Sequence, residues 1–232
     1  MSGARVFALA SLLWGSAASA WAGGDGPGPR LSASIERAAS GWDLKLTIAE
    51  FQFASDRAVA AAPRPGEGHV DLAVDGKRSR SLFETNAHID PLPAGTHEIR
   101  VTLAGNDDKP LLGTAGSPTA ARFLVWVPRS RPTSPPGVIR SLELAIAKGK
   151  VSGTAAPGTF RVTQGETLQI RWNVDEPVGV HLHGYDVEAA LTPGLPTVML
   201  IPAELPGRFS IETHGERGRP ATVLHYVEVY PR

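Results

Sequence analysis

The sequence of 232 residues contains no cysteine. This absence excludes disulfide bonds, a catalytic thiol, lipid attachment through cysteine and thiolate metal ligands. Charge of one sign is not in excess either, since 23 Lys and Arg residues balance 23 Asp and Glu residues. Proteins that bind nucleic acid need a basic face to neutralise phosphates. We therefore expect no nucleic-acid partner.

Sequence motifs of the common catalytic families are also missing. The chain has no G-x-S-x-G elbow, no phosphate-binding loop, no G-x-G-x-x-G after a predicted strand and no H-E-x-x-H. Its carboxylates are scattered over turns and loops, and none are paired as a general acid and base. We expect that the chain is not an enzyme.

The N-terminus has the three parts of a secretory signal peptide. Arg5 supplies the positive charge, residues 6–14 are apolar, and Ala20-Trp21-Ala22 is an A-x-A cleavage signal. The apolar run is shorter than the roughly 20 residues that span a bilayer, and no later segment reaches that length. We predict a signal peptide over 1–22 for the general secretory route, a flexible leader over 23–29, and a periplasmic or secreted mature chain without a membrane span.

The rest of the sequence alternates apolar and polar residues in short runs between turns rich in its 25 glycines and 20 prolines. In the first half this pattern predicts strands over 31–38, 42–53, 70–74, 97–104 and 122–127. The apolar parity changes near Ala49 and Glu50, which predicts a bulge or bend there. Asp75-Gly76 is a predicted turn. Residues 30–127 are thus expected to form an antiparallel β-sandwich.

A proline-rich segment, residues 128–137, follows this half and is predicted to be the linker between two domains. The second domain, residues 138–232, again shows strand patterns, with predicted strands over 142–146, 160–162, 168–174, 178–187, 197–201, 208–213 and 223–230. Helical periodicity is weak throughout. The fold class predicted is all-β, with two antiparallel β-sandwich domains.

Three histidines form the one constellation that suggests chemistry. His181 and His183 are two apart in VHLHGYD, so on a strand both imidazoles point to one face, together with Tyr185. His214 follows a predicted strand and begins a glycine-rich loop. Neutral imidazole binds copper, zinc and nickel well. The pattern indicates a metal site, and the alternative is a polar strand face with an unrelated loop histidine.

The second half resembles a cupredoxin-like domain, a Greek-key β-sandwich. The resemblance runs from Phe160 to Pro231 and rests on FRVTQGETLQIRW, VHLHGYDVE, TPGLPTVMLIPAELPGRFSIETHGE and a final VEVYP strand. It implies His181, His183 and His214 as metal ligands. The chain departs from blue-copper members because it lacks the cysteine ligand, and Met199 lies mid-strand instead of in the ligand loop.

What remains is a site of imidazoles alone with an open position, which suits copper, with zinc as the alternative. The expected function is to bind copper for carriage, storage or delivery, with a metal-trafficking or membrane-transport protein as partner. The alternative is a metal-free periplasmic module of two β-sandwiches with a structural or interaction role. His225 shares parity with Val227 and Val229 and is expected to be a core histidine, with a fourth ligand as the alternative.

The first half resembles secreted β-sandwich modules found beside metal-handling domains, through GEGHVDLAVDGK, NAHIDPLPAGTHEIRVTL and AGNDD. It keeps three histidines of that pattern, His69, His88 and His97, but has Asp71 and Asp108 where two others would stand. His69 and Asp71 are predicted to share an outward face, which leaves a mixed nitrogen and oxygen site open. A purely structural role is the favoured interpretation of this half.

Overall fold

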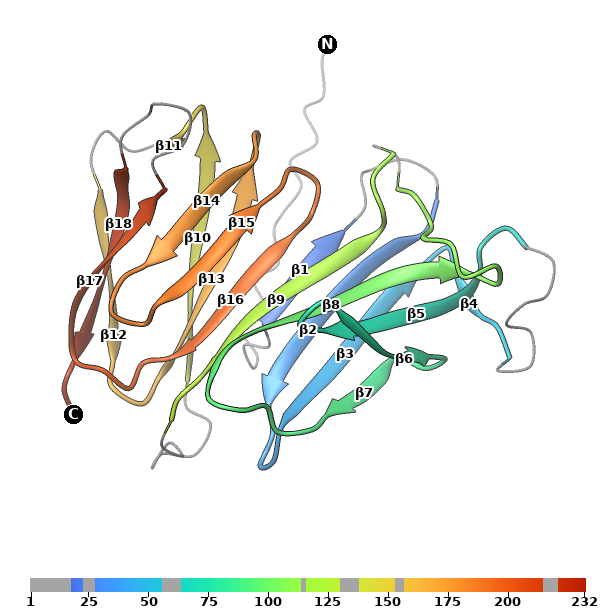
Figure 1. Cartoon of the computed structure of the whole chain (residues 1–232), viewed down its shortest axis with the longest axis horizontal. Helices are drawn as coiled ribbons and strands as arrows, with labels where there is room; N and C mark the ends of the chain where they lie inside the picture. The colour runs from blue at the N-terminus through green and yellow to red at the C-terminus, as the bar shows by residue number, and fades with distance from the viewer. Residues whose placement is uncertain are drawn as a thin grey trace, which may run out of the picture.

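The computed structural model describes residues 18–22, 28–55, 64–113, 116–129, 138–152, 157–214 and 221–232. Within these ranges the regular secondary structure consists of β-strands in three sheets (Figure 1). No helix in the same ranges is long and apolar enough to cross a membrane. The predicted all-β class is confirmed. Most of the predicted linker lies outside the described residues, as do 1–17 and 23–27.

The first sheet has four strands in the order β1 (Ala18–Ala22), β2 (Arg30–Arg37), β3 (Trp42–Ala49) and β7 (Asn86–Ile89). Leu31, Ala33 and Ile35 of β2 and Leu44 of β3 are buried on its inner face. The edge strand β1 contains the predicted cleavage signal, and its backbone pairs antiparallel with β2 from Ala18 opposite Ile35 to Ala22 opposite Leu31.

The central sheet has nine strands, and β6 branches from it at β5. In spatial order they are β11 (Lys150–Val151), β10 (Ile139–Ala147), β13 (Thr167–Val174), β16 (Thr197–Pro202), β9 (Ala120–Val127), β8 (Gly95–Gly105), β5 (Glu67–Val74) and β4 (Gln52–Phe53), with β6 (Lys77–Leu82) beside β5. β9 and β16 pair in parallel, from Arg122 opposite Thr197 to Val125 opposite Leu200. The two halves of the chain therefore share one sheet.

The third sheet is formed by the second half alone, in the order β12 (Gly158–Thr163), β18 (Thr222–Tyr230), β17 (Gly207–Thr213), β14 (Val178–Leu182) and β15 (Val187–Leu191). β14 and β15 form a hairpin, the chain crosses to the central sheet for β16, and β17 returns to lie beside β14. This return is a Greek-key connection, as the resemblance of residues 160–231 implies. Parallel pairs also occur, β10 with β13 and β12 with β18, so the sandwich is mixed and not wholly antiparallel.

The shared strands β9 and β16 separate two hydrophobic cores. Phe123 and Val198 face the core beneath the first sheet, whereas their neighbours Leu124 and Met199 face the core beneath the third sheet. Alternate side chains of a strand point to opposite faces, so one pair of strands serves both cores. Apolar burial on both faces holds the two sandwiches together in addition to the chain connection over 128–137.

Local backbone conformations agree with two predictions from the sequence. Glu50 has a φ of 56° between β3 and β4, at the predicted bend. Asp75 and Gly76 have φ angles of 51° and 74° in the turn that joins β5 to β6, as two-residue hairpins require.

Candidate metal site

The three predicted histidines lie together on the outer face of the third sheet. On β14, Val180 and Leu182 point into the core, so His181 between them points outward. The His181 and His183 ring centroids are 4.2 Å apart, and those of His181 and His214 are 5.8 Å apart with nearly parallel planes. The predicted grouping of the three side chains is thus present in the structure.

Backbone hydrogen bonds fix two of these residues against neighbouring strands. The His183 N–H donates to the carbonyl of Ser210 at 3.0 Å, and the His214 N–H donates to the carbonyl of Gly179 at 3.0 Å. His183 directly precedes Gly184, which has a φ of 78° and whose missing side chain leaves room for the ring of Phe209. The turn after β14 is therefore shaped by glycine, which adopts this conformation without strain.

That turn changes the direction of Tyr185. The prediction that Tyr185 shares the histidine face is wrong, because the strand ends at Leu182 and the turn reverses the alternation of side chains. Tyr185 is buried, packs edge-on against Trp126 and Phe209, and donates its hydroxyl to the carbonyl of Leu205 at 3.2 Å. Burial raises the pKa of Tyr185 to about 12, so it stays protonated beneath the site.

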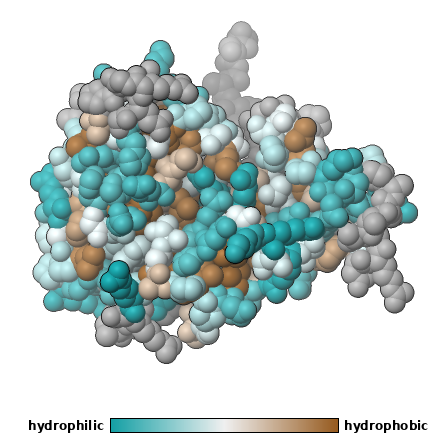
Figure 2. All heavy atoms as spheres, in the orientation of Figure 1, coloured by the Kyte–Doolittle hydropathy of each residue, from teal (hydrophilic) through white to brown (hydrophobic). Residues whose placement is uncertain are grey.

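Three carboxylates surround the imidazoles, and sequence reasoning did not single them out. Glu188 of β15 and Glu212 of β17 are the register partners of His181 on either side. Each histidine Nε2 faces one carboxylate. His181 lies 3.4 Å from Asp186, His183 lies 3.3 Å from Glu212, and His214 lies 3.8 Å from Glu188. Hydrophilic residues accordingly gather over β14, β15 and β17 (Figure 2).

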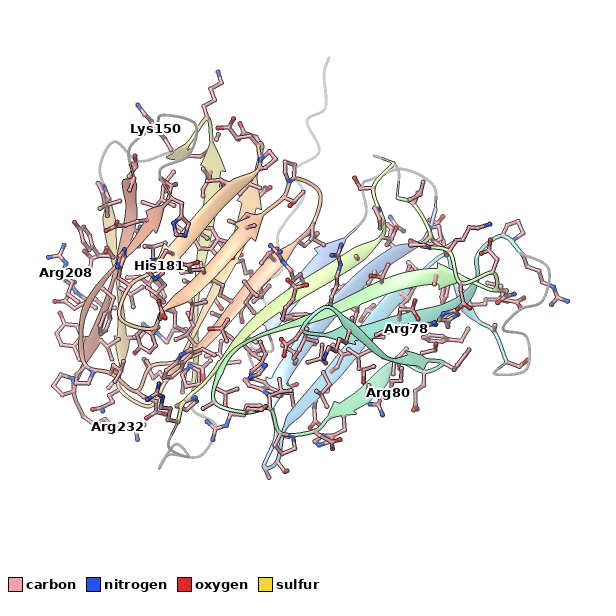
Figure 3. The ribbon with its side chains drawn as sticks, viewed as in Figure 1. Arg78, Arg80, Lys150, His181, Arg208 and Arg232 are labelled. Carbon is pink, nitrogen blue, oxygen red and sulfur yellow. The ribbon has the colours of Figure 1, made fainter. Side chains whose placement is uncertain are left out.

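His181 is the most enclosed of the three histidines, with 18% of its side chain exposed against 48% for His183 and 40% for His214. It lies on β14, an inner strand of the third sheet (Figure 3). Its Nε2 atom is buried and has no hydrogen-bond partner among the described residues. Asp186 lies within ion-pair range of this atom but makes no hydrogen bond with it. A buried imidazole nitrogen without a partner is unfavourable unless another ligand satisfies it.

In the described part of the chain, no three His, Asp or Glu side chains hold their donor atoms ready around one metal position. The rotamers of the histidine cluster explain this, because each Nε2 turns toward a carboxylate instead of toward a common centre. His183 and His214 are half exposed, so their rings are free of the packing that fixes buried side chains. The residue types and their positions fit a copper or zinc ion, whereas their present rotamers do not yet enclose one.

The other histidines do not join this cluster. His225 is the register partner of Ile211, whose side chain points into the core, and its ring packs against Gly158. It is thus on the opposite face of the sheet from His181, and burial lowers its pKa. In the first half, His88 pairs with Asp43 at 2.8 Å and His97 with Asp75 at 2.8 Å, on different strands.

The predicted outward position of His69 is wrong. Its side chain is fully buried, because β6 and the turn at 106–108 cover that face of the central sheet. Its Nε2 atom lies 3.2 Å from Asp71 and 3.3 Å from Asp108. The guanidinium of Arg78 lies between these groups, a residue that the sequence did not single out.

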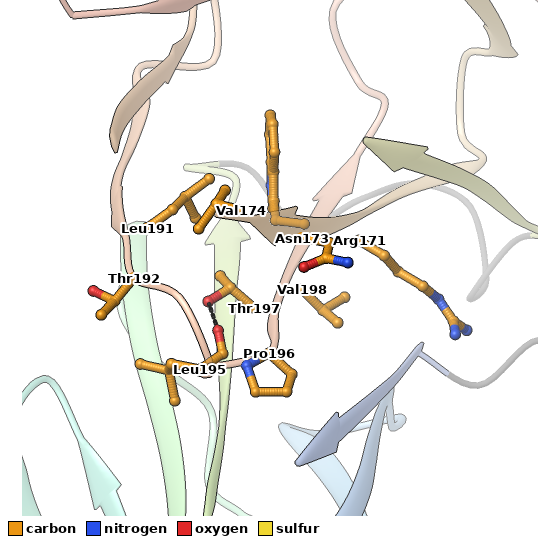
Figure 4. A pocket seen from close by; sticks show the side chains of 11 residues that line it. Arg171, Asn173, Val174, Leu191, Thr192, Leu195, Pro196, Thr197 and Val198 are labelled. Carbon is orange, nitrogen blue, oxygen red and sulfur yellow. Dashed lines mark hydrogen bonds between the residues drawn. The ribbon is translucent and has the colours of Figure 1, made fainter. Parts of the chain in front are cut away.

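Two surface hollows lie apart from the histidine cluster. One of about 280 Å³ is lined by β13, the loop before β16 and β16 itself, and Arg171 is the only ionisable group in its lining (Figure 4). A second, of about 470 Å³, lies between Trp42 and Trp126, with Arg37 as its ionisable group. Neither lining pairs an acid with a base, so neither suggests acid and base catalysis.

No protein-family model matches the sequence, and no curated protein matches it. Among solved structures, the chain is similar to one described as a heme-copper terminal oxidase dimer, at 17% identity over 53% of this chain and 80% of that chain, with a TM-score of 0.31. It is similar to a blue copper oxidase from Nitrosomonas europaea at 13% identity, over 74% of this chain and 70% of that chain, with a TM-score of 0.32. It is also similar to a multicopper oxidase at 16% identity, over 70% of this chain and 71% of that chain, with a TM-score of 0.29. At this level of similarity the fold is read from the strands and sheets themselves.

Proposed function

We propose that this chain is an exported protein that binds copper, with zinc as the competing ion, through His181, His183 and His214, in order to carry, store or deliver it. The observation that carries the proposal is the grouping of these imidazoles on the third sheet, with centroid separations of 4.2 and 5.8 Å. The unsatisfied, buried Nε2 atom of His181 supports it, since a metal ion would supply the missing partner.

His181, His183 and His214 would hold the ion in different ways. His181 would be the fixed ligand, because β15 and β17 flank it and enclose its ring. His183 and His214 would complete the set by rotating from Glu212 and Glu188. The carboxylates balance the charge of a divalent ion and would accept the N–H of a turned imidazole, which orients a metal-bound histidine. Copper bound there supplies a cation for transfer to a partner.

The donor set decides the kind of function. Nitrogen and oxygen donors without thiolate suit Cu(II) and Zn(II), and they lack the cysteine that tunes a blue-copper electron-transfer centre. The half-exposed rings of His183 and His214 lie at the surface, where a partner's ligands can reach the ion. A carrier needs such access, whereas an electron-transfer site is usually enclosed. The proposed partner is a metal-trafficking or membrane-transport protein.

Elemental analysis of the purified chain, stripped of metal and reloaded with copper or zinc, tests the proposal. We expect one equivalent of copper, retained through buffer exchange and lost when His181, His183 and His214 are all replaced by alanine. His88→Ala is the matched control, because His88 is an equally exposed histidine paired with a carboxylate outside the cluster. Absence of retained metal in the unaltered chain would overturn the proposal and favour a metal-free module of two sandwiches.

A further inference from the structure

A second cluster of metal-ligating side chains lies in the first half, around Arg78 of β6. The Nη2 atom of Arg78 is 2.6 Å from Asp71 Oδ1, 3.0 Å from Asp108 Oδ1, 2.8 Å from Ser81 Oγ and 3.2 Å from His69 Nε2. Four potential acceptors therefore surround one nitrogen atom, which carries only two hydrogens. The cluster provides more acceptors than this end of the guanidinium can satisfy by hydrogen bonding.

The two distances from His69 to the carboxylates match the spacing of ligands around a small metal ion. His69 Nε2 is 3.2 Å from Asp71 Oδ1 and 3.3 Å from Asp108 Oδ1. Tetrahedral zinc sites with bonds of about 2.0–2.1 Å place neighbouring ligand atoms about 3.3 Å apart. Imidazole and carboxylate are ligands that zinc and copper accept. For Arg78 to donate to Nε2, this nitrogen must carry its lone pair, as a metal ligand also must.

The fold holds these ligands in defined positions. His69 is fully buried, and its ring lies 5.7 Å from that of Phe83. Asp71 is two residues from His69 on β5, so the two side chains share one face of the strand. Asp108 has a φ of 59° in the turn after β8, which brings its carboxylate over β5. Two chain segments, β5 and the turn after β8, thus bring three potential ligands to the guanidinium of Arg78, and no three such side chains in the described part of the chain leave a metal position open.

We propose that His69, Asp71 and Asp108 form a divalent-metal site whose place is taken by the guanidinium of Arg78. The positive charge of Arg78 compensates the two carboxylates as an ion would, so the unaltered first half takes up metal only by displacing this side chain. The position is remote from the histidine cluster, since Arg78 and His181 lie in opposite halves of the molecule (Figure 3). This inference does not depend on the proposed copper function.

Zinc binding by full-length variants tests the inference. The background carries alanine at His181, His183 and His214, so any zinc measured comes from elsewhere. In that background Arg78→Leu removes the competing charge and every donor, and we expect one zinc equivalent bound at least tenfold more tightly than in the parent. Asp108→Asn added to Arg78→Leu should abolish the gain, and cobalt in place of zinc should give the visible absorption of a tetrahedral site.

Arg80→Leu is the matched control, because Arg80 is an exposed arginine of the same strand whose guanidinium donates to the carbonyl of His88. A gain of zinc by Arg80→Leu equal to that of Arg78→Leu would overturn the inference, as would a folded Arg78→Leu variant that binds no zinc. If Arg78→Leu does not fold, Arg78→Gln keeps an amide donor for Asp71 and is measured in its place by the same criteria. Failure of the copper site would leave these outcomes unchanged.

Discussion

Replacing Gly184 by alanine should destabilise the protein through two separable effects. Gly184 has a φ of 78°, and an alanine there adopts the left-handed conformation at a cost of about 1–2 kcal/mol. Its Cβ would also run into the ring of Phe209, which packs against Tyr185. Overpacking of this kind typically costs about 1–3 kcal/mol. Together, we expect Gly184→Ala to lower the free energy of unfolding by about 2–5 kcal/mol.

Gly76→Ala provides the matched control. Gly76 has a nearly identical φ of 74°, but a Cβ there meets nothing within 4 Å. Its loss should be only the conformational part, about 1–2 kcal/mol. Urea unfolding of the two variants measures the difference, and melting should show it as well, at about 2–4 °C per kcal/mol for a chain of this size.

The two variants should also differ in metal binding. Gly184 adjoins His183, whose N–H bond to Ser210 positions the proposed ligand. If the displaced His183 costs about 1.4 kcal/mol of copper-binding free energy, the affinity falls tenfold. We expect a loss of about this size in Gly184→Ala and no loss in Gly76→Ala. Equal losses of stability in both variants would contradict this expectation, since contact with Phe209 would then add nothing to the conformational cost.

Burial lowers the pKa of His225, so the contribution of this residue to stability is complete above its pKa in the unfolded chain, near 6.5, and is lost as the pH falls through its lower pKa in the folded chain. His225→Phe should therefore flatten the dependence of stability on pH below about 6.5, as measured by urea unfolding at several pH values. An unchanged slope would contradict this. Arg122 donates to the carbonyl of Ala190 at 2.7 Å and to Thr197 at 3.2 Å where the halves meet. Arg122→Met should therefore lower the free energy of unfolding by about 2–4 kcal/mol. As the control, Arg140→Met at an exposed arginine should change it by less than about 0.5 kcal/mol. In an exporting cell, N-terminal sequencing of the exported chain should begin at Gly23, which removes β1 from the edge of β2; an exported chain that retains Ala22 would refute the predicted cleavage.

Much of the fold follows from local patterns in the sequence. Alternation along residues 42–48 predicts the buried face of β3, and Trp42, Leu44 and Leu46 are buried there. The change of parity predicts the bend that the φ of Glu50 confirms. These features are local because side-chain direction in a strand is fixed by position alone. The common face of His181 and His183 is predictable for the same reason.

The shared sheet was not predicted, although a signal for it exists. Every residue of β16 is buried, and six of the eight residues of β9 are buried. Continuous apolar runs are typical of strands covered on both faces. Read in that way, the run over 197–202 and the run over 120–125, which is apolar except for Arg122, indicate strands at the centre of the molecule and not the edges of two separate domains. Which strand each would pair with depends on distant contacts that no local pattern contains.

The charged partners of the sites escaped prediction for a related reason. Glu188 and Glu212 reach His181 only through strand register across β15 and β17. Arg78 reaches His69 because β6 branches from β5 with a register shift between Leu72 and Ala73, and because a long side chain spans the remaining distance. Pairing each histidine with the alternate residues of the next hairpin strand would have found Glu188, since the β14–β15 turn is short.

Pulsed electron paramagnetic resonance of the Cu(II)-loaded chain tests whether His181, His183 and His214 bind copper, because it detects the remote nitrogens of imidazole ligands. We expect modulation from several imidazoles that decreases with each single alanine substitution at His181, His183 and His214, and that is unchanged in His88→Ala. A spectrum that persists in the triple alanine variant, or a chain that binds no Cu(II), would contradict it.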